Sequence, residues 1–311
     1  MEKTPNNDFI VETRKLKNRF EEMIQPFSSD LWNYCRYVTG SAWDGEDLFQ
    51  DTMIKSFGLL PQQWDKVIDK KSYLFRIATN TWLDQCRRRK KEIGSLEEIA
   101  EKSIDITDCL ILEEVLISLQ EHFTPKQTTS FLLFDVFHFN ADEVAGIVKS
   151  TPGGVYATVQ RVRKKIQLID FSKPKQGTTV EKTNNETIKA YLKAFNDGDL
   201  EGMLSLYSDH AQNEAYLGFQ EFNKNEIRKG SLRFGLPGHT AEEVILWNKP
   251  VIIVFSNAGE APEIHDIQIH EVENGKIVSS KSYFFRKEFI FAAATDLGFK
   301  VQMVKPPVNW S

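Results

Sequence analysis

Two clusters of basic residues are the parts of this sequence whose side chains could bind a polyanion. The first basic block is residues 87–91, five consecutive cations that follow Trp82 in the segment NTWLDQCRRRKK (residues 80–91). Cations hold phosphate groups and an aromatic ring stacks on an exposed base, so this pattern suits nucleic-acid binding. A solvated helix end explains the block as well, because cations near a helix C-terminus interact favourably with the helix dipole.

The second basic block lies at the end of the segment FNADEVAGIVKSTPGGVYATVQRVRKKI (residues 139–166). Local signals in this segment predict a helix-turn-helix. A first helix is expected from residue 140 or 141 to residue 148, and residues 149–150 would turn the chain. Thr151 is a favourable N-cap for the second helix, and Pro152 suits its first position, where a missing N–H costs nothing.

The two faces of this second helix differ in polarity. The buried face is expected to hold the apolar residues at helical spacing, which are Val155, Val159, Val162 and Ile166. The outer face is expected to hold Tyr156, Ala157, Gln160, Arg161 and Lys164. Such a helix enters the major groove of DNA with its early residues near bases and its later cations near phosphates. An ordinary helical hairpin with a basic exposed face is the alternative.

The charge balance favours directed binding over a general coating of nucleic acid. The 311 residues carry a formal net charge of −5, with 39 basic and 44 acidic side chains. An acidic stretch that contains Asp44, Glu46, Asp47 and Asp51 precedes the first basic block. Basic patches in an acidic chain predict a specific nucleic-acid site, and the acidic stretch suggests a second partner of another kind.

Cysteine usage and hydropathy limit the compartment and the cofactors. Cys35, Cys86 and Cys109 are odd in number and widely spaced, which argues against a disulfide framework and against a zinc site. No apolar run approaches the roughly 18 residues that a membrane span needs, and the first ten residues lack the pattern of a signal peptide. We therefore expect a cytoplasmic protein without membrane contact, metal or cofactor.

Helical periodicity dominates residues 8–170, and the pattern changes after them. A loop is expected over residues 59–72, where Pro61 interrupts the periodicity, followed by a helix over about residues 72–91. Residues 186–208 predict two helices that meet at an Asp-Gly-Asp sequence, and strands are expected from about Glu243. Helices followed by an antiparallel sheet indicate an α+β domain.

Turn and linker signals set the domain boundaries. The dipeptide Asn274-Gly275 is a strong hairpin signal within the strand region. The acidic and polar stretches that lack apolar periodicity are expected to be linkers. The resulting division is a helical domain at 8–92, a linker at 93–109, a second helical domain at 110–170, a linker at 171–185 and a final domain at 186–311.

Three segments in the first 170 residues resemble the extracytoplasmic-function (ECF) class of bacterial RNA polymerase sigma factors. GEDLFQDTMIKSF (residues 45–57) is similar to the acidic helix of region two, and residues 72–91 resemble the segment that binds and melts the −10 promoter element. Residues 139–165 resemble region four, which reads the −35 element. The resemblance implies a multidomain fold with two all-α sigma domains, a region-two helical bundle and a region-four helix-turn-helix.

The resemblance also implies partners and site residues. The partners would be core RNA polymerase, through the β′ clamp helices and the β subunit, and promoter DNA in double-stranded and melted form. Core polymerase would contact Asp47, Leu48, Gln50 and Asp51. The −10 element would contact Asn80, Trp82, Arg87, Arg88, Arg89 and Lys90. The −35 element would contact Thr151, Tyr156, Ala157, Gln160, Arg161 and Lys164.

Two details of this assignment carry alternatives. The 60–71 loop corresponds to one that holds a flipped-out base in the family, where stacking and edge contacts offset the cost of unstacking. The family more often has a small residue at the place of Trp82, so this side chain either contacts DNA or packs in the core.

Residues 184–300 resemble the SnoaL-like branch of the nuclear-transport-factor-two-like fold, a cone-shaped α+β domain. Residues 187–211 are similar to its opening helices, and residues 272–285 are similar to its closing hairpin. The resemblance implies a regulatory domain that binds a small ligand or makes an intramolecular contact. The linker motif Trp-Leu-Pro-Glu-Pro and the Gly-rich motif of some fused members are missing from this sequence, which leaves the docking contact open.

The leading hypothesis is a sigma factor without an active site of its own, whose C-terminal domain modulates its activity. A DNA-binding repressor with a ligand-sensing domain is the first alternative, and it would need a dimer and symmetrical half-sites. The acidic 45–57 segment speaks against a repressor, which has no use for it. The second alternative is a SnoaL-like enzyme fused to a DNA-binding module, with His265, Asp266 and His270 as proton-transfer candidates.

Overall fold

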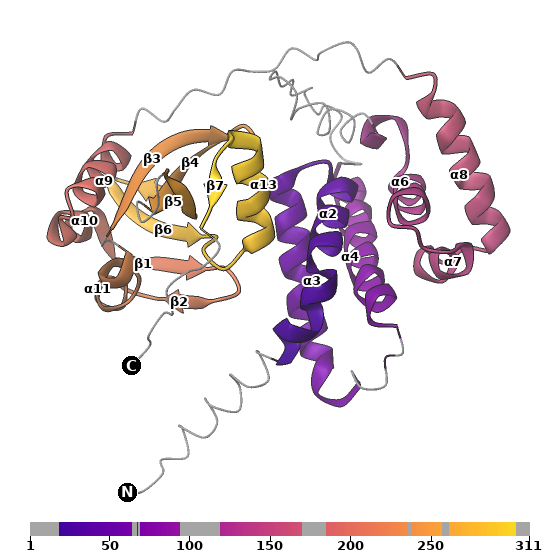
Figure 1. Ribbon diagram of the computed structural model, residues 1–311, viewed down its shortest axis with the longest axis horizontal. Helices are drawn as coiled ribbons and strands as arrows, with labels where there is room; N and C mark the ends of the chain where they lie inside the picture. Colours follow the sequence, from indigo (N-terminus) through magenta and orange to yellow (C-terminus); the bar gives the residue numbers. More distant parts are fainter. Residues whose placement is uncertain are drawn as a thin grey trace, which may run out of the picture. The chain divides into compact units, whose positions relative to one another are not determined.

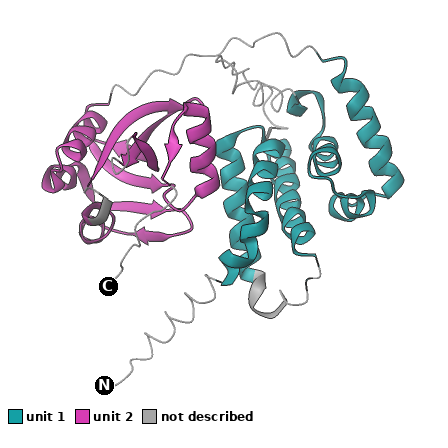
Figure 2. Cartoon of the chain, in the orientation of Figure 1, with its two compact units in different colours: residues 1–101, 107–174 teal, residues 102–106, 175–311 magenta. Residues whose placement is uncertain are grey.

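A computed structural model of the chain shows two compact units, drawn in different colours in Figure 2. The helical unit comprises residues 1–101 and 107–174, and the sheet unit comprises residues 102–106 and 175–311. The structure describes residues 19–63, 67, 69–93, 119–169, 185–235, 238–256 and 261–302. Both predicted linkers lie largely outside these residues.

The helical unit is built from two lobes. The first lobe, residues 19–93, contains η1 (Gln25–Phe27), α2 (Ser28–Thr39), α3 (Ala42–Gln63) and α4 (Lys70–Ile93). The second lobe, residues 119–169, contains α6 (Pro125–Phe131), the π-helical turn η3 (Leu132–Val136), α7 (Ala141–Val148) and α8 (Pro152–Ile166). The two helical domains predicted from the sequence therefore pack together within one unit.

The apolar spacing of α2 explains how the first lobe forms. Leu31, Tyr34, Cys35 and Val38 recur at helical intervals, and all four are buried. Gly40 ends the helix with φ at 69°, in the left-handed region that glycine adopts without steric cost. The tight turn lets α3 begin at once and pack antiparallel beside α2 (Figure 1).

The loop expected over residues 59–72 is wrong in its extent. Helix α3 continues to Gln63, and α4 already begins at Lys70. Pro61 lies in the last turn of α3 rather than in a loop. Asp69 is the N-cap of α4, because its carboxylate accepts a hydrogen bond from the Ser72 backbone N–H at 3.0 Å.

The helix-turn-helix forms as the sequence predicts. Asn140 and Glu143 make a capping box in which each side chain accepts from the other's backbone N–H, at 2.8 and 2.9 Å. Lys149 turns the chain with φ at 52°. Thr151 caps α8 by accepting from the Gly154 N–H at 3.1 Å, and Pro152 occupies the first position. These local signals fix α7 and α8 relative to each other.

The sheet unit begins with two helices, as expected, and continues into a sheet with three further helices. The helices are α9 (Glu186–Asn196), α10 (Leu200–Leu206), α11 (Lys224–Lys229), α12 (Ser231–Gly235) and α13 (Lys287–Leu297). The strands are β1 (Tyr207–Ala215), β2 (Phe219–Glu221), β3 (His239–Leu246), β4 (Lys249–Ser256), β5 (Glu263–Glu273), β6 (Lys276–Ser282) and β7 (Lys300–Val301). The curved sheet has α9 and α10 at one side and α13 at the other (Figure 1).

The predicted α+β class is confirmed, but the sheet is mixed rather than antiparallel. Its strand order is β2-β1-β6-β5-β4-β3, with β7 paired to β5. Strand β1 runs parallel to β6, and β7 runs parallel to β5. Strand β1, which brings the parallel pair with β6, and strand β2 both precede Glu243, and the sequence prediction missed them. The Asn274-Gly275 hairpin between β5 and β6 is confirmed, with positive φ at both residues.

The core of the sheet unit lies between α9, α10 and the concave side of the sheet. Ile188, Tyr191 and Phe195 from α9 pack with Met203 from α10 and Ile252 from β4. Burial of these large side chains is the main stabilising term of the unit. In the part of the chain that the structure describes, no helix is both long enough and apolar enough to cross a membrane.

Candidate functional site

The acidic helix α3 exposes only part of the surface predicted to bind polymerase. Asp47 is exposed and Asp51 is half-buried, whereas Leu48 and Gln50 are buried at 1% and 8% exposure. Leu48 and Gln50 therefore hold the bundle, and their side chains do not reach a partner in this structure. Glu46 is also buried, and it accepts hydrogen bonds from Trp32 Nε1 and Gln50 Nε2, both at 2.8 Å.

The exposed face of α3 forms a stripe of two parts. Asp44, Asp47 and Asp51 follow one another at intervals of three and four residues, which places them on one side of the helix. Ile54 continues this side with 65% of its surface exposed, and Phe57 lies beside it. We call these five residues the α3 stripe. Negative charge followed by exposed apolar surface suits a protein partner better than DNA.

The C-terminal end of α4 carries the first basic block on its surface. Arg87, Arg88, Arg89 and Lys90 are all exposed, while Asn80 is half-buried about two to three turns earlier. Arg87 forms an ion pair with Asp84 at 2.6 Å, and its Nε donates to the Leu83 carbonyl at 3.2 Å. An exposed pair of this kind is weak, so a phosphate can displace it.

Trp82 belongs to the core rather than to the exposed surface of α4. Its ring is 5% exposed, and the guanidinium carbon of Arg89 lies 5.8 Å from the ring centroid. This burial favours the packing alternative for Trp82, and its contact with the −10 element stays a prediction. The indole still influences the surface of α4, because its π face holds the Arg89 guanidinium, a cation that is expected to contact phosphate.

The four cations of α8 fall into two pairs, one with contacts inside its own lobe and one on the outer face. Arg163 binds Asp135 of η3 through two hydrogen bonds, at 2.8 and 2.5 Å. Lys165 donates to the His122 carbonyl at 2.7 Å and lies 5.2 Å from the Phe123 ring. These two cations anchor α8 to its own lobe. Arg161 and Lys164 are exposed on the outer face, as the sequence predicts.

The remaining outer residues of α8 also lie where a DNA groove could reach them. Tyr156, Ala157 and Gln160 are exposed, and Tyr156 keeps its orientation through an edge-to-face contact with Phe134 at 5.5 Å. Thr151 is exposed but already caps α8. Asp135 and Phe134 could not be predicted from local sequence patterns, because both contact α8 from another helix.

Two of the proton-transfer candidates of the sheet unit, Asp266 and His265, are buried and hydrogen-bonded to neighbouring residues. Asp266 is buried and accepts hydrogen bonds from the Ile267 N–H, Gln268 Nε2 and Ser282 Oγ at 2.8 to 2.9 Å. His265 is buried too, and its Nδ1 is bonded to Gln302 Oε1 at 2.5 Å. The two adjacent residues thus bind partners from different parts of the sheet.

His270 stands in a third environment, against the tyrosines of the core. Its ring lies 4.5 Å from that of Tyr191, and both of its nitrogens are buried without a hydrogen-bond partner. Burial lowers the pKa of His270 to about 3 and raises the pKa of Tyr207 to about 12. Both pKa values lie far from 7, which makes His270 a weak base and Tyr207 a weak acid at that pH.

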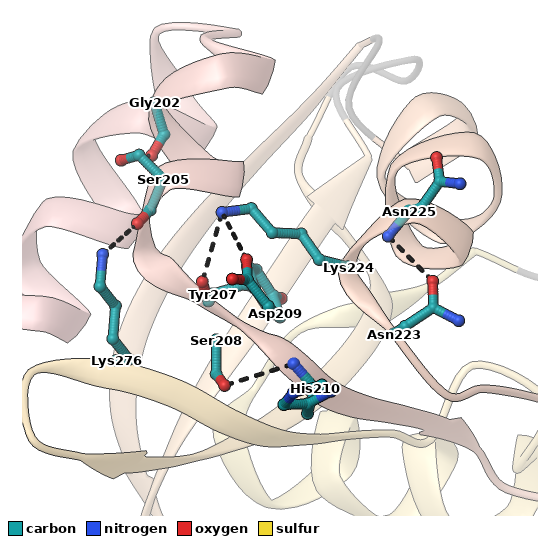
Figure 3. Close-up of polar contacts among 10 residues, drawn as sticks. All are labelled: Gly202, Ser205, Tyr207, Ser208, Asp209, His210, Asn223, Lys224, Asn225 and Lys276. Atoms are coloured by element: carbon teal, nitrogen blue, oxygen red, sulfur yellow. Dashed lines mark hydrogen bonds and ion pairs between the residues drawn. The ribbon is translucent and has the colours of Figure 1, made fainter.

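A groove on the same unit is lined by α10, β1 and α11. Figure 3 shows Lys224 between Asp209 and the Tyr207 carbonyl, at 3.8 and 3.5 Å. Arg228, also at this groove, is paired with Glu201. Because both cations face carboxylates, the groove has no charge excess with which to select a charged ligand.

Comparison with known proteins identifies the first lobe. The family sigma-70 region 2 matches residues 23–92. The ECF RNA polymerase sigma factor SigG of Mycobacterium tuberculosis is 25% identical over 225 residues, which are 62% of this chain and 60% of that protein. The RNA polymerase sigma-E factor of Streptomyces avermitilis is 25% identical over 152 residues, 48% of this chain and 83% of that protein.

Solved structures show more distant similarity. The ECF sigma factor SigJ of Mycobacterium tuberculosis is 16% identical and covers 83% of this chain and 95% of its own, with a TM-score of 0.33. An NTF-2 like protein from Burkholderia xenovorans is 20% identical, covers 39% of this chain and 85% of its own, and has a TM-score of 0.26. The chain spans 60% of the length of SigG. Residues 23–92 thus match sigma-70 region 2, and the chain is similar in sequence to ECF sigma factors.

Proposed function

We propose that this protein is a sigma factor, which binds core RNA polymerase and directs it to particular promoters. The observation that carries the proposal is the sigma-70 region 2 at residues 23–92, which coincides with α2, α3 and α4. This bundle presents an acidic and apolar stripe on one helix and a basic block on the next. Two exposed surfaces of opposite charge suit a protein that joins a polymerase to DNA.

The α3 stripe is the proposed contact with polymerase. Asp47 and Asp51 would meet basic residues of the β′ clamp helices, and Ile54 would add apolar area at the edge of the contact. Leu48 and Gln50 support this surface from below. A DNA-binding repressor would gain nothing from such a stripe, since phosphates repel carboxylates.

The basic surfaces of α4 and α8 are the proposed contacts with promoter DNA. Asn80 and the exposed cations of residues 87–90 would address the −10 element in duplex and melted form. Arg161 and Lys164 would hold phosphates at the −35 element, while Tyr156 and Gln160 face the bases. Polymerisation belongs to the partner, so the chain needs neither a metal nor a cofactor for this role, and it acts in the cytoplasm with the polymerase.

The proposed role of the sheet unit is to modulate the helical unit. Support comes from the state of its polar residues, because Asp266, His265 and Glu221 are buried and already hydrogen-bonded to neighbours. A catalytic acid or base needs access to substrate and a pKa near the working pH. An intramolecular contact or a bound ligand demands neither.

Run-off transcription with core RNA polymerase tests this proposal. The full-length protein would be compared with a version that ends near Lys173, on fragmented genomic DNA as template. We expect discrete start sites that core polymerase alone does not give, and a change in their intensity on truncation. Folded protein that yields no start site in either form would refute the sigma assignment. Equal intensities would refute a modulating role for the sheet unit.

A further inference from the structure

The segment 137–139 contains two aromatic residues and joins the two lobes of the helical unit. Phe137, at the end of η3, places its ring 5.5 Å from Tyr34 and 5.4 Å from Phe75 of the first lobe. Phe139 follows with its ring 5.0 Å from Phe75. At these separations aromatic rings attract one another beyond the simple burial of area. The segment 137–139 thus inserts from the second lobe between α2 and α4.

The backbone of segment 137–139 has an uncommon conformation. His138 has φ at 57°, in the left-handed region that residues other than glycine seldom adopt. Two hydrogen bonds fix it there, from the Phe137 N–H to the Leu132 carbonyl at 3.0 Å and from the Phe139 N–H to the Leu133 carbonyl at 2.9 Å. Such conformations persist where the surroundings enforce them, and they concentrate at switch segments.

The residues of the first lobe that contact these rings are themselves held in place. Tyr34 is fully buried, and its hydroxyl is hydrogen-bonded to Thr79 at 2.5 Å, which fixes the ring between α2 and α4. Lys71 lies 5.5 Å from the Phe139 ring, at the distance of a cation–π contact. Gln120 adds a polar link between the lobes by donating to the Val38 carbonyl at 3.0 Å.

The closed arrangement of the lobes conflicts with the length of a promoter. Elements centred at −10 and −35 are about 25 base pairs apart, which is roughly 85 Å of duplex at 3.4 Å per pair. A compact unit of about 150 residues has a radius of gyration of roughly 15 Å. Because α4 and α7 are in direct contact within the unit, the two DNA surfaces cannot reach both elements while the lobes stay together.

We propose that Phe137 and Phe139 form an aromatic clasp that holds the lobes closed in the free protein and releases when polymerase and promoter are bound. The clasp restrains the sigma module from within, without the sheet unit. It rests on the proposed function, since only a chain that reads two distant elements has to open. Ligands that bind only an open state bind in proportion to the open fraction, so a weaker clasp raises the apparent affinity.

The test uses the full chain with one ring removed at a time. Phe137→Ala deletes a half-buried ring that crosses to the first lobe. Phe134→Ala is the matched control, because this ring leaves from the same π-helical turn but packs on Tyr156 inside its own lobe. Gln120→Ala is a milder second variant that removes only the hydrogen bond to Val38.

Two readouts are needed. Fluorescent labels at Ser29→Cys on α2 and Asp142→Cys on α7, both exposed, report the distance between the lobes in a chain with Cys86 and Cys109 replaced by serine. Affinity for core polymerase is measured with the same proteins. We expect a short distance in the free wild type and a distance longer by tens of ångströms when polymerase and promoter are bound.

The variants then separate the clasp from the function. Phe137→Ala is expected to show the long distance between the labels without polymerase and to bind core polymerase about tenfold more tightly. Gln120→Ala should shift the distance and the affinity in the same direction but by less. Phe134→Ala should leave both the distance and the affinity unchanged. Wild-type binding to polymerase together with an unchanged Phe137→Ala would overturn the clasp alone. A free chain that is compact but binds no polymerase would overturn the proposed function, and the clasp as a restraint with it.

Discussion

The helical unit and the sheet unit differ in where some of their charged groups lie. In the helical unit the acidic residues Asp44 and Asp47 and the basic residues of α4 and α8 lie on the surface. In the sheet unit Glu221, Asp266 and Arg286 are buried. Exposed charge is available to a partner, whereas buried charge is committed to the fold because it must be hydrogen-bonded where it lies. A charge substitution should therefore change binding in one unit and stability in the other.

Glu46 qualifies this contrast. It is a buried carboxylate of the helical unit and accepts hydrogen bonds from Trp32 of α2 and Gln50 of α3. Arg36 of α2 is buried as well, so the helical unit also uses buried charges, and Glu46 links α2 to the helix that carries the exposed ones. The difference between the units is thus one of access, and it can be measured.

The largest expected effect is on the sheet unit, at Glu221. Its carboxylate accepts from Asn213 Nδ2 at 2.8 Å, the Ser231 N–H at 2.8 Å and Ser231 Oγ at 2.6 Å, which ties β1 and β2 to α12. Glu221→Ala leaves these donors unsatisfied and is expected to lower the free energy of unfolding of this unit by about 3 kcal/mol or more. Calorimetry that resolves the two units measures the loss.

The control for Glu221 is an exposed carboxylate of the same sheet. Glu242 lies on the surface of β3, so Glu242→Ala should change the unfolding of the sheet unit by about 0.5 kcal/mol or less. Binding to core polymerase should be the same for both variants. A Glu221→Ala protein as stable as Glu242→Ala would break the comparison on the side of the sheet unit.

Asp47 is expected to show the next largest effect, now on binding. Asp47→Arg reverses a charge in the middle of the acidic part of the α3 stripe, and we expect affinity for core polymerase to fall by about 100-fold through like-charge repulsion. The melting temperature should change little, because interactions of an exposed side chain contribute little to stability. Asp142→Arg, an equal charge reversal on the exposed face of α7, should bind normally. If Asp47→Arg binds normally too, the polymerase contact lies elsewhere.

The elements predicted best from the sequence are those whose signals are local. The turn between α7 and α8 depends on caps within a few residues, at Asn140 and Thr151, so it could be placed to the residue. The same holds for the Asn274-Gly275 hairpin. Strand β1 escaped prediction because its sequence YSDHAQNEA is polar, and its partners Ile277 to Ser282 lie some 70 residues later in the chain.

The candidate site shows the same limit. Residues 45–57 and 87–90 could be recognised from their types and order, but the side of α3 that faces solvent could not. Leu48 and Gln50 are buried because α2 and α4 pack against α3, and Trp82 is a buried residue of α4 itself. The ring contacts of Phe137 with Phe75 and Tyr34 join residues about 60 and 100 positions apart, for which no local pattern exists.

A smaller effect is expected from pH on the sheet unit. The pKa of His270 is about 3 in the folded protein, below its ordinary value of about 6.5. Between these values the unfolded chain binds a proton that the folded chain does not, so the contribution of His270 to stability is complete above pH 6.5 and is lost as pH falls towards 3. The slope approaches about 1.4 kcal/mol per pH unit.

Substitution separates this slope from other titrations. His270→Phe keeps a ring against Tyr191 and cannot bind a proton. We expect the free energy of unfolding of the sheet unit to fall between pH 6.5 and 5 by less in His270→Phe than in the wild type, in urea titrations at each pH. Equal slopes would mean that His270 accepts a proton in the folded state, and that this buried group is not sealed from solvent.

The smallest expected effect concerns the two arginines of α8, where the contrast holds within one helix. Arg161 is exposed and directed outward, so Arg161→Ala should weaken binding to −35 duplex about tenfold and reduce the salt slope by about 1. Arg163 binds Asp135, so Arg163→Ala should lower the melting temperature of the helical unit and leave the salt slope unchanged. Filter binding across a salt series, with core-polymerase affinity as the control, distinguishes them. Equal salt slopes for the two variants would mean that position on α8, rather than prior pairing with a carboxylate, decides which cation meets phosphate.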